Sequence, residues 1–167
     1  LGWSIKHADS LIRDYKPQLL KALQLADSDI VDFKQNIKKE LGKNLSANLE
    51  TEEAFFEEKI MERLEIKTYH KYSPKVAFDF ETEESEGTRK LFFIMLTILD
   101  VVKKNKILLI DEIEDSLHPK IIEYIIDIFN MGKSAQLIFS THNTNLLDLS
   151  KFRKDQIWFV NKKEDGG

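Results

Sequence analysis

Cysteine is absent from the 167 residues of this chain. Its absence excludes disulfide frameworks, thiol nucleophiles and cysteine-based zinc sites, and it is compatible with a reducing compartment. No stretch approaches the run of about 18 apolar residues that a membrane-spanning helix needs. Neither sign of charge dominates, because 25 basic residues face 29 acidic ones for a net charge of −4. Length and composition together predict a soluble, cytoplasmic, globular protein of one domain or slightly more.

The start of the chain lacks both an initiator methionine and the basic-then-apolar pattern of a secretory signal. We therefore expect Leu1 to be a cut within a longer protein. Internal repeats and a basic stripe with interleaved aromatic residues are also missing. The isoelectric point of about 5.6 lies below the value above roughly 9 that is typical of DNA-binding domains. One modest basic cluster exists, and a solvated surface is its simplest interpretation; it comprises Lys34, Lys38, Lys39 and Lys43.

Residues 1–80 predict a small region of helices and antiparallel strands. Apolar residues at helical spacing over 8–25 indicate two short helices with a break at Pro17. Residues 29–39 fit both a helix face and a half-buried strand, and we favour the strand. Residues 41–49 resemble a loop.

The rest of this region combines a predicted helix with a predicted hairpin. Residues 51–64 begin with Thr51 as a helix cap and continue with acids and an apolar stripe, which predicts an amphipathic helix. The alternating runs 65–72 and 75–81 predict an antiparallel hairpin. We expect residues 1–80 to form an arm or lid.

After residue 81 the pattern becomes one of alternating helices and strands. The expected helices are a long one ending at Lys104, one over 119–131 and one over 144–149, and the expected strands are 107–110, 136–139 and 156–160. A continuously apolar run such as 107–110 is typical of a strand buried on both faces. The alternation predicts an α/β fold with a parallel sheet and helices on both faces, whose ligands bind beyond the carboxyl ends of the strands.

Two acids, Asp111 and Glu112, end the first of these strands. Charge is unfavourable there unless something cationic binds, and Mg²⁺ with a nucleotide would supply it. In a Walker B arrangement Asp111 belongs to the Mg²⁺ shell, and Glu112 orients or deprotonates the attacking water. An apolar strand ending in Asp-Glu is also common in α/β proteins without such a role.

Two further groups of polar residues stand at element ends. His142 follows the next strand, at the same expected edge of the sheet, and could reach a γ-phosphate; a structural histidine is the alternative. Ser85, Gly87 and Thr88 open the long helix, so hydroxyl and backbone N–H groups gather at a positive helix terminus that suits anions. An ordinary N-cap at Ser85 is the alternative there.

Taken in order, these motifs resemble the C-terminal portion of an ABC-type ATPase. The branch is that of the structural-maintenance-of-chromosomes and OLD-like proteins, and especially the bacterial AAA ATPases linked to restriction and abortive infection. The correspondence assigns 85–90 to the signature motif, 107–112 to Walker B, 115–119 to the D-loop, His142 to the switch histidine and 152–158 to a subgroup feature. Residues 81–167 would form this P-loop NTPase portion.

The resemblance implies an anti-phage or DNA-related ATPase whose two heads form a homodimer around ATP and Mg²⁺. Asp111 would hold the metal, and Glu112 and His142 would act on their own nucleotide. Ser85, Gly87 and Thr88 would contact the γ-phosphate bound to the second head. A nuclease subunit or nucleic acid would be a further partner, and no membrane is implied.

The Walker A motif that a phosphate cradle needs, G-x-x-x-x-G-K-[ST] between a strand and a helix, is missing from the sequence. Gly132-Lys133-Ser134 is the nearest approach, but Asp127 stands where the first glycine should be, and a helix precedes it. We therefore expect an isolated fragment of this extent to be inactive.

Two other readings remain open. The first is an inert dimerisation or partner-binding module that keeps these motifs by descent. The second is a metal nuclease of the TOPRIM kind, suggested by Glu86-Gly87 and Asp111. That reading fits less well, because residues 82–85 separate Glu86 from the preceding strand and Ile113 occupies the position of a metal carboxylate.

Overall fold

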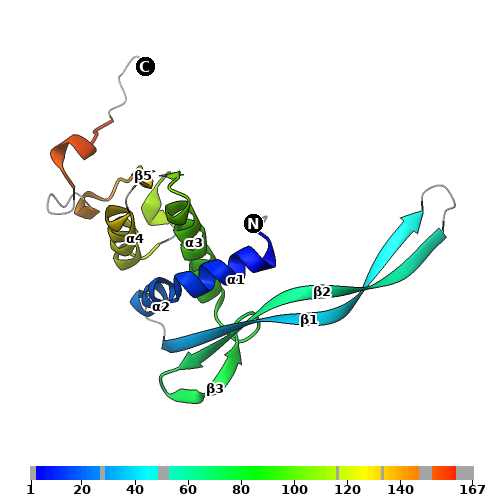
Figure 1. Cartoon of the computed structure of the whole chain (residues 1–167). Coiled ribbons are helices and arrows are strands. Elements are labelled where there is room, and N and C mark those ends of the chain that lie inside the picture. Colours follow the sequence, from blue (N-terminus) through cyan, green and yellow to red (C-terminus); the bar gives the residue numbers. More distant parts are fainter. Residues whose placement is uncertain are drawn as a thin grey trace.

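The computed structural model describes residues 3–26, 29–48, 53–115, 117–132, 134–146 and 152–160. Its helices are α1 (Ile5–Asp14), α2 (Lys16–Leu25), α3 (Glu86–Lys103) and α4 (Pro119–Met131), with short 3-10 turns η1 (Ile113–Asp115), η2 (Thr144–Leu146) and η3 (Lys154–Gln156). Its strands are β1 (Ile30–Asn48), β2 (Glu53–His70), β3 (Ser73–Asp79), β4 (Ile107–Ile110) and β5 (Gln136–Phe139). The fold is mixed α/β, as predicted. Figure 1 shows the β1–β2 hairpin projecting as a long arm from a body that holds the helices.

The first two helices meet at Tyr15. Ser4 caps α1 by accepting the backbone N–H of His7 at 3.2 Å. Pro17 lies in the first turn of α2, where its missing N–H leaves no helical hydrogen bond unmade. The predicted pair of short helices is confirmed, but the break lies at Tyr15, two residues before the predicted break at Pro17.

The hairpin arm corrects two predictions. β1 and β2 pair antiparallel in one register from Asp32 opposite Tyr69 to Asn48 opposite Glu53. The strand predicted over 29–39 is confirmed. The loop predicted over 41–49 is wrong for its described residues, 41–48, because they continue β1. The helix predicted over 51–64 is wrong, because its described residues, 53–64, belong to β2. Thr51, the predicted cap, lies outside the described residues.

Both errors have one physical cause. Phe56, Ile60 and Leu64 recur every four residues, a spacing that suits a helix face and equally one face of a strand. In the folded chain Ile37 stands opposite Leu64, and Leu41 stands opposite Ile60. The apolar residues of β1 and β2 match across the hairpin, and this pairing stabilises two strands. A local window of sequence does not show which distant segment will pair with it.

β3 widens the sheet only at the base of the arm. Its pairing with β2 runs from Lys67 opposite Asp79 to His70 opposite Ser73. The ammonium of Lys67 also lies 3.0 Å from the carboxylate of Asp79. The hairpin predicted from residues 65–72 and 75–81 is confirmed, and the arm beyond it is a two-stranded ribbon.

A parallel pair of strands, β4 and β5, carries the second part of the chain. Ile107 stands opposite Gln136 and Ile110 opposite Phe139, which confirms the predicted strands and the parallel sheet. The expectation that helices cover both faces is wrong for the described residues. One face packs on the core through Leu108 and Leu137, whereas the other is open, with exposed fractions of 60% for Ile107, 72% for Leu109 and 54% for Ile138.

The last predicted elements differ from the structure. Of the helix predicted over 144–149, the described part is the 3-10 turn η2, and residues 147–149 lie outside the description. The strand predicted over 156–160 is wrong: after η3 the chain is irregular, and Trp158, Phe159 and Val160 are exposed. An apolar run becomes a strand only where it finds an edge to pair with, and this segment pairs with no described strand.

One core joins the arm to the helices on both sides of the predicted boundary at residue 80. Phe92 of α3 lies at its centre, with its ring centroid 5.6 Å from that of Phe33 in β1 and 4.9 Å from that of Phe80. All three side chains are buried, and Ile125 of α4 belongs to the same cluster. The base of the arm is therefore anchored in the core of the body. None of the described helices is long and apolar enough to cross a bilayer.

Candidate functional site

The carboxyl ends of β4 and β5 bring two predicted groups of residues together. Asp111 and Glu112 follow β4, and Ser140 follows β5. The Ser140 hydroxyl donates to a carboxylate oxygen of Asp111 and accepts the backbone N–H of Glu112 at 2.9 Å. The backbone of Ser140 continues the parallel pairing, since its N–H donates to the carbonyl of Ile110 at 3.0 Å. The hydroxyl of Ser140 thus serves the acidic edge.

Glu112 has a backbone conformation that side chains rarely adopt. Its φ of 47° lies in the left-handed region, which costs free energy for a residue with a Cβ atom. The Ser140 hydroxyl holds its N–H, and the next residue, Ile113, donates its own N–H to the Ser140 carbonyl at 3.2 Å. Ile113 is buried, so the chain turns sharply between an exposed acid and a core residue.

The surroundings of Glu112 raise its pKa above the ordinary value. The largest cause is a hydrogen bond with the carboxyl group of Asp115, followed by the negative charges of Asp115 and Asp111, while His142 acts in the opposite direction. Adjacent carboxylates cannot all ionise freely, because like charges oppose one another. Glu112 therefore holds a proton more readily than an isolated glutamate does.

Glu114 orients the predicted histidine. The Nδ1 atom of His142 lies 3.0 Å from Glu114 Oε1, and the backbone N–H of His142 donates to the same oxygen at 2.8 Å. Burial by itself would raise the pKa of Glu114, but hydrogen bonds from backbone N–H groups and from Thr141 outweigh it and lower the pKa. Glu114 thus stays ionised beside the imidazole. A carboxylate in this position fixes the orientation of the imidazole ring.

Sequence reasoning missed Glu114 and Asp115 as members of this edge. Both belong to the acidic run that follows β4, which was the available signal. Their roles depend on contacts with Glu112 and His142 that only the turn η1 creates. An acidic run by itself indicates a solvated surface as readily as a site.

The start of α3 forms a separate group. Ser85 caps the helix by accepting the backbone N–H of Thr88 at 3.0 Å, and the two hydroxyl oxygens lie 2.8 Å apart. The N-cap reading of Ser85 is therefore confirmed, and the exposed hydroxyl pair stands at the positive end of a long helix. Gly87 lies in the first turn between them.

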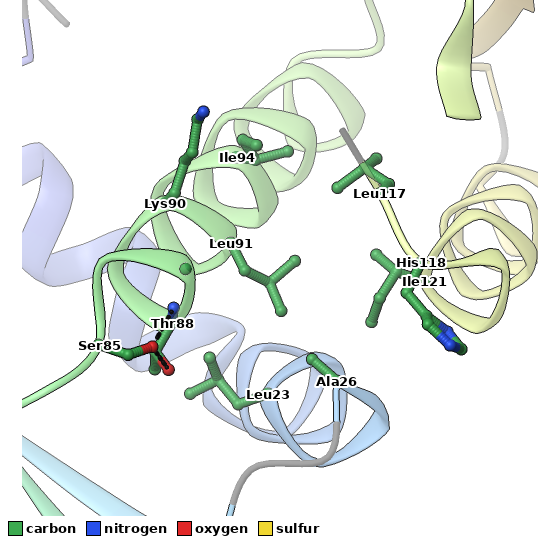
Figure 2. A pocket seen from close by; sticks show the side chains of 11 residues that line it. Leu23, Ala26, Ser85, Thr88, Lys90, Leu91, Ile94, Leu117, His118 and Ile121 are labelled. Atoms are coloured by element: carbon green, nitrogen blue, oxygen red, sulfur yellow. Dashed lines mark hydrogen bonds between the residues drawn. The ribbon is translucent and has the colours of Figure 1, made fainter. Parts of the chain in front are cut away.

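A pocket of about 300 Å³ opens beside this helix start. Figure 2 shows Ser85 and Thr88 at one end of it, and Leu117, His118 and Ile121 at the other. His118 is the N-cap of α4, so the N-termini of two helices border the same space. The lining also includes the remaining residues Leu23, Ala26, Gly87, Lys90, Leu91 and Ile94.

The structure thus divides the predicted site residues into two groups. Asp111, Glu112 and His142 belong to the carboxyl edge of the sheet, and none of them lines the pocket at the start of α3. Ser85, Gly87 and Thr88 line that pocket together. One small ligand held in this pocket would therefore meet the second group alone.

The base of the arm is tied to the residue before Ser85. The carboxylate of Glu84 accepts a hydrogen bond from the Thr68 hydroxyl and lies 2.8 Å from His70 Nε2. Thr68 and His70 both belong to β2. A displacement of the arm would therefore act directly on the chain that enters α3.

A metal ion at the acidic edge would find oxygen donors. Among the described residues no group of three or more His, Cys, Asp or Glu side chains could hold a metal ion unaided. Mg²⁺ is commonly held by one or two carboxylates together with substrate phosphates and water. Asp111 with the neighbouring Ser140 hydroxyl fits that partial donor set, so Mg²⁺ would arrive here with a phosphate ligand.

Residues 3–148 match the model of the family described as "AAA domain, putative AbiEii toxin, Type IV TA system". The chain belongs to this family, because the match spans most of its length, including the arm and the two helices before it. An AAA domain is a nucleotide-binding ATPase domain, so membership indicates ATP as the ligand class. No curated protein matches the chain at a significant level.

Proposed function

We propose that the chain is the ATP-binding and ATP-hydrolysing C-terminal portion of an ABC-type head, in the branch of structural-maintenance-of-chromosomes and OLD-like ATPases. The observation that carries this proposal is the Ser140 bridge, whose hydroxyl contacts both acids at the end of a parallel strand. Asp111 would take the Walker B position beside Mg²⁺. Bound there, the ion would neutralise phosphate charge.

Glu112 is the proposed base for the attacking water. Its exposed carboxylate stands beyond the sheet edge, and its raised pKa makes it a better proton acceptor at neutral pH than an ordinary glutamate. His142, held by Glu114, would present its second ring nitrogen toward the γ-phosphate. Burial of Ile113 counts against the TOPRIM alternative, since a buried isoleucine stands where the second metal carboxylate should be.

Ser85, Gly87 and Thr88 are proposed to act on the nucleotide of a second head. Their separation from the acidic edge, in a pocket of their own, supports this division of labour. The working form would then be a homodimer with two shared sites. The Walker A cradle would come from residues outside the printed sequence, since α4 precedes Gly132 and the required strand-to-helix context is reversed. We propose that the isolated chain does not hydrolyse ATP.

The biological setting is proposed from the family. Its description names a toxin and a type IV toxin–antitoxin system, which agrees with an anti-phage or DNA-related role in the cytoplasm. A nuclease subunit or nucleic acid would be the partner that the ATP cycle controls. An inert binding module, the alternative, would keep the same fold without turnover.

ATP binding and hydrolysis by the longest natural form of the protein test this proposal. Three proteins are compared: that form, its Glu112→Gln variant and the 167-residue chain. We expect turnover by the first, an ATP-bound dimer without turnover for the second, and neither property for the third. Glu40→Gln, an exposed change on the arm, is the control. An inert natural form that Glu112→Gln leaves unchanged would establish the binding-module alternative.

A further inference from the structure

The outer half of the arm has one face without a partner among the described residues. β3 pairs with β2 only from Lys67 to His70, so from Lys39 and Glu62 outward the arm is a two-stranded ribbon. Such a ribbon is at best marginally stable in water unless another layer covers its apolar face. The two faces of this ribbon differ in what they carry.

The first face continues the core. Near the body it carries Phe33 and Ile66, which are buried against the helices. Further out it carries the paired residues Leu41 and Ile60, whose exposed fractions are 68% and 64%. We call this surface, from the Lys39–Glu62 pair outward, the outer arm face. The backbone register continues beyond it with Leu45 opposite Phe56 and Ala47 opposite Ala54.

The second face already has its contacts within the chain. Lys38 forms an ion pair with Glu65 at 2.6 Å, and Arg63 pairs with Glu81. Met61 covers Gly42 so closely that a Cβ atom at Gly42 would collide with its methyl group. Met61 is nevertheless 48% exposed, less than Leu41 and Ile60 on the outer arm face. Among the described side chains of the outer arm, the most exposed apolar pair therefore lies on the outer arm face.

The charged residues on the outer arm face indicate which partner would fit it. Lys39 lies on β1, and the cross-strand residue opposite it is Glu62 on β2. A second copy rotated by a two-fold axis along the arm would place its β2 over the β1 of the first copy. Each Lys39 would then face a Glu62 of the second copy, and Leu41 would face Ile60. A two-fold axis across the arm would instead bring β1 over β1 and lysine near lysine.

We propose that the outer arm face is a dimerisation surface on which a second copy of this chain packs face to face, with both arms pointing the same way. The apolar pair Leu41 and Ile60 would form the centre, and Lys39 and Glu62 would form the polar rim that sets orientation. Opposite charges across a rim fix register and exclude wrong pairings. This contact needs no nucleotide, so it is independent of the proposed ATPase activity.

A charge-swap experiment tests the proposal on the whole protein in the absence of nucleotide. Lys39→Glu and Glu62→Lys are made separately, and sedimentation measures the oligomeric state. We expect a dimer for the unmodified protein and a homodimer weakened at least roughly tenfold in each variant, which corresponds to about 1.4 kcal/mol. We expect the mixture of the two variants to form a one-to-one heterodimer.

The mixture separates contact between chains from damage within a chain. Each variant has like charges opposite one another across its own hairpin, and mixing does not change that. Recovery on mixing can therefore come only from the second copy. The matched controls Lys38→Glu and Glu65→Lys make the same charge changes on the second face and should both remain homodimers. Circular dichroism of every variant checks the fold.

Three results would overturn the proposal. The first is an unmodified protein that stays monomeric at all accessible concentrations, as expected if a different protein covers the arm. The second is a Lys39→Glu homodimer as tight as that of the unmodified protein. The third is equal weakening by the two control substitutions. Each of these outcomes leaves ATP hydrolysis by the natural protein unaffected, so the two proposals fail separately.

Discussion

Glu112 shares its immediate surroundings with two other acids, and their proximity controls when it can act as a base. Asp115 contributes most to its raised pKa, through a hydrogen bond and through its charge, and Asp111 adds a smaller effect. A general base works only in its ionised form. The acid side of the pH–rate profile should therefore report the ionisation of Glu112.

Replacing Asp115 by asparagine removes one negative charge beside Glu112. The pKa of Glu112 should then fall toward its ordinary value, because an ionised Glu112 would face only the smaller effect of Asp111. Glu112 stays ionised to lower pH, so the acid limb of kcat/KM for ATP should move to lower pH in the natural protein. Glu40→Gln, an exposed change on the arm, should leave the acid limb in place. An unmoved limb in Asp115→Asn would exclude Glu112 as the group that titrates.

Individual residues of the acidic edge show how much of this site the sequence could predict. The rule that parallel strands present their carboxyl ends at one edge was enough to place Asp111, Glu112 and the segment of His142 together. The same rule gave no role to Ser140 as a bridge or to Glu114 as the partner of His142. Those roles depend on the angle at which the chain leaves each strand, which spacing in the sequence does not encode.

Among the elements, α3 carries the packing that joins the arm to the body. Phe92 is 1% exposed and contacts both Phe33 and Phe80, whereas the adjacent Phe93 is 44% exposed. The two residues have the same chemistry and neighbouring positions. They therefore form a matched pair that isolates the contribution of burial.

Phe92→Ala should lower the free energy of unfolding by about 3–5 kcal/mol, because it leaves a cavity among rings that cannot collapse fully. Phe93→Ala should cost about 1 kcal/mol, which is typical of a partly exposed site. Urea denaturation followed by circular dichroism gives both values. Equal losses in the two variants would mean that the core is not centred on Phe92.

β3 is held to β2 partly by the carboxylate of Asp79. Its pKa is lowered from 3.8 to about 2, first by the hydrogen bond from Lys67 and then by contacts with Thr82 that outweigh burial. A lowered pKa means that the ionised form stabilises the fold. This stabilisation is fully present above pH 3.8 and is lost as the pH falls toward 2.

Asp79→Asn should therefore be less stable than the unmodified protein at neutral pH. The difference between their urea midpoints should shrink as the pH falls from 3.8 to about 2. Glu58→Gln checks the effect of removing an exposed charge elsewhere. A difference that stays constant over this range would show that the Asp79 charge does not stabilise the β2–β3 pairing.

At the element level, prediction succeeded where local pattern and tertiary pairing agree. Helices α3 and α4 were predicted because their apolar patterns are too long for a strand, and strands β4 and β5 because short apolar runs between polar ends are typical of buried strands. The outer arm was predicted wrongly, because the spacing of Phe56, Ile60 and Leu64 fits both a helix and a strand. Pairing with β1 decides in favour of the strand. Residues 156–160 were predicted as a strand from their local pattern, but they pair with no described strand.

On the scale of the whole molecule, the open face of the β4–β5 sheet is the largest departure from expectation. Parallel sheets are normally covered on both faces, yet Ile107, Leu109 and Ile138 are exposed here. Contiguous exposed apolar side chains on a folded protein bind apolar dyes and partners. Their neighbours Leu108 and Leu137 point into the core instead.

Threonine at all three exposed positions should reduce the fluorescence of a bound apolar dye in the 167-residue chain and should scarcely change its thermal stability. Leu108→Thr is the contrast on the packed face, where we expect a loss of about 1–3 kcal/mol. Dye titration and thermal denaturation measure the two effects. Strong destabilisation by the triple variant would mean that the open face is covered within the chain itself.

The regular register of the arm limits how its length can change. Side chains of a strand alternate between faces, so one residue added to each strand near Lys39 would turn every residue beyond it over. Leu41 and Ile60 would then move to the second face. Two residues added to each strand would lengthen the arm and preserve both faces. Insertions and deletions that are tolerated in evolution should accordingly add or remove an even number of residues in each strand of the hairpin.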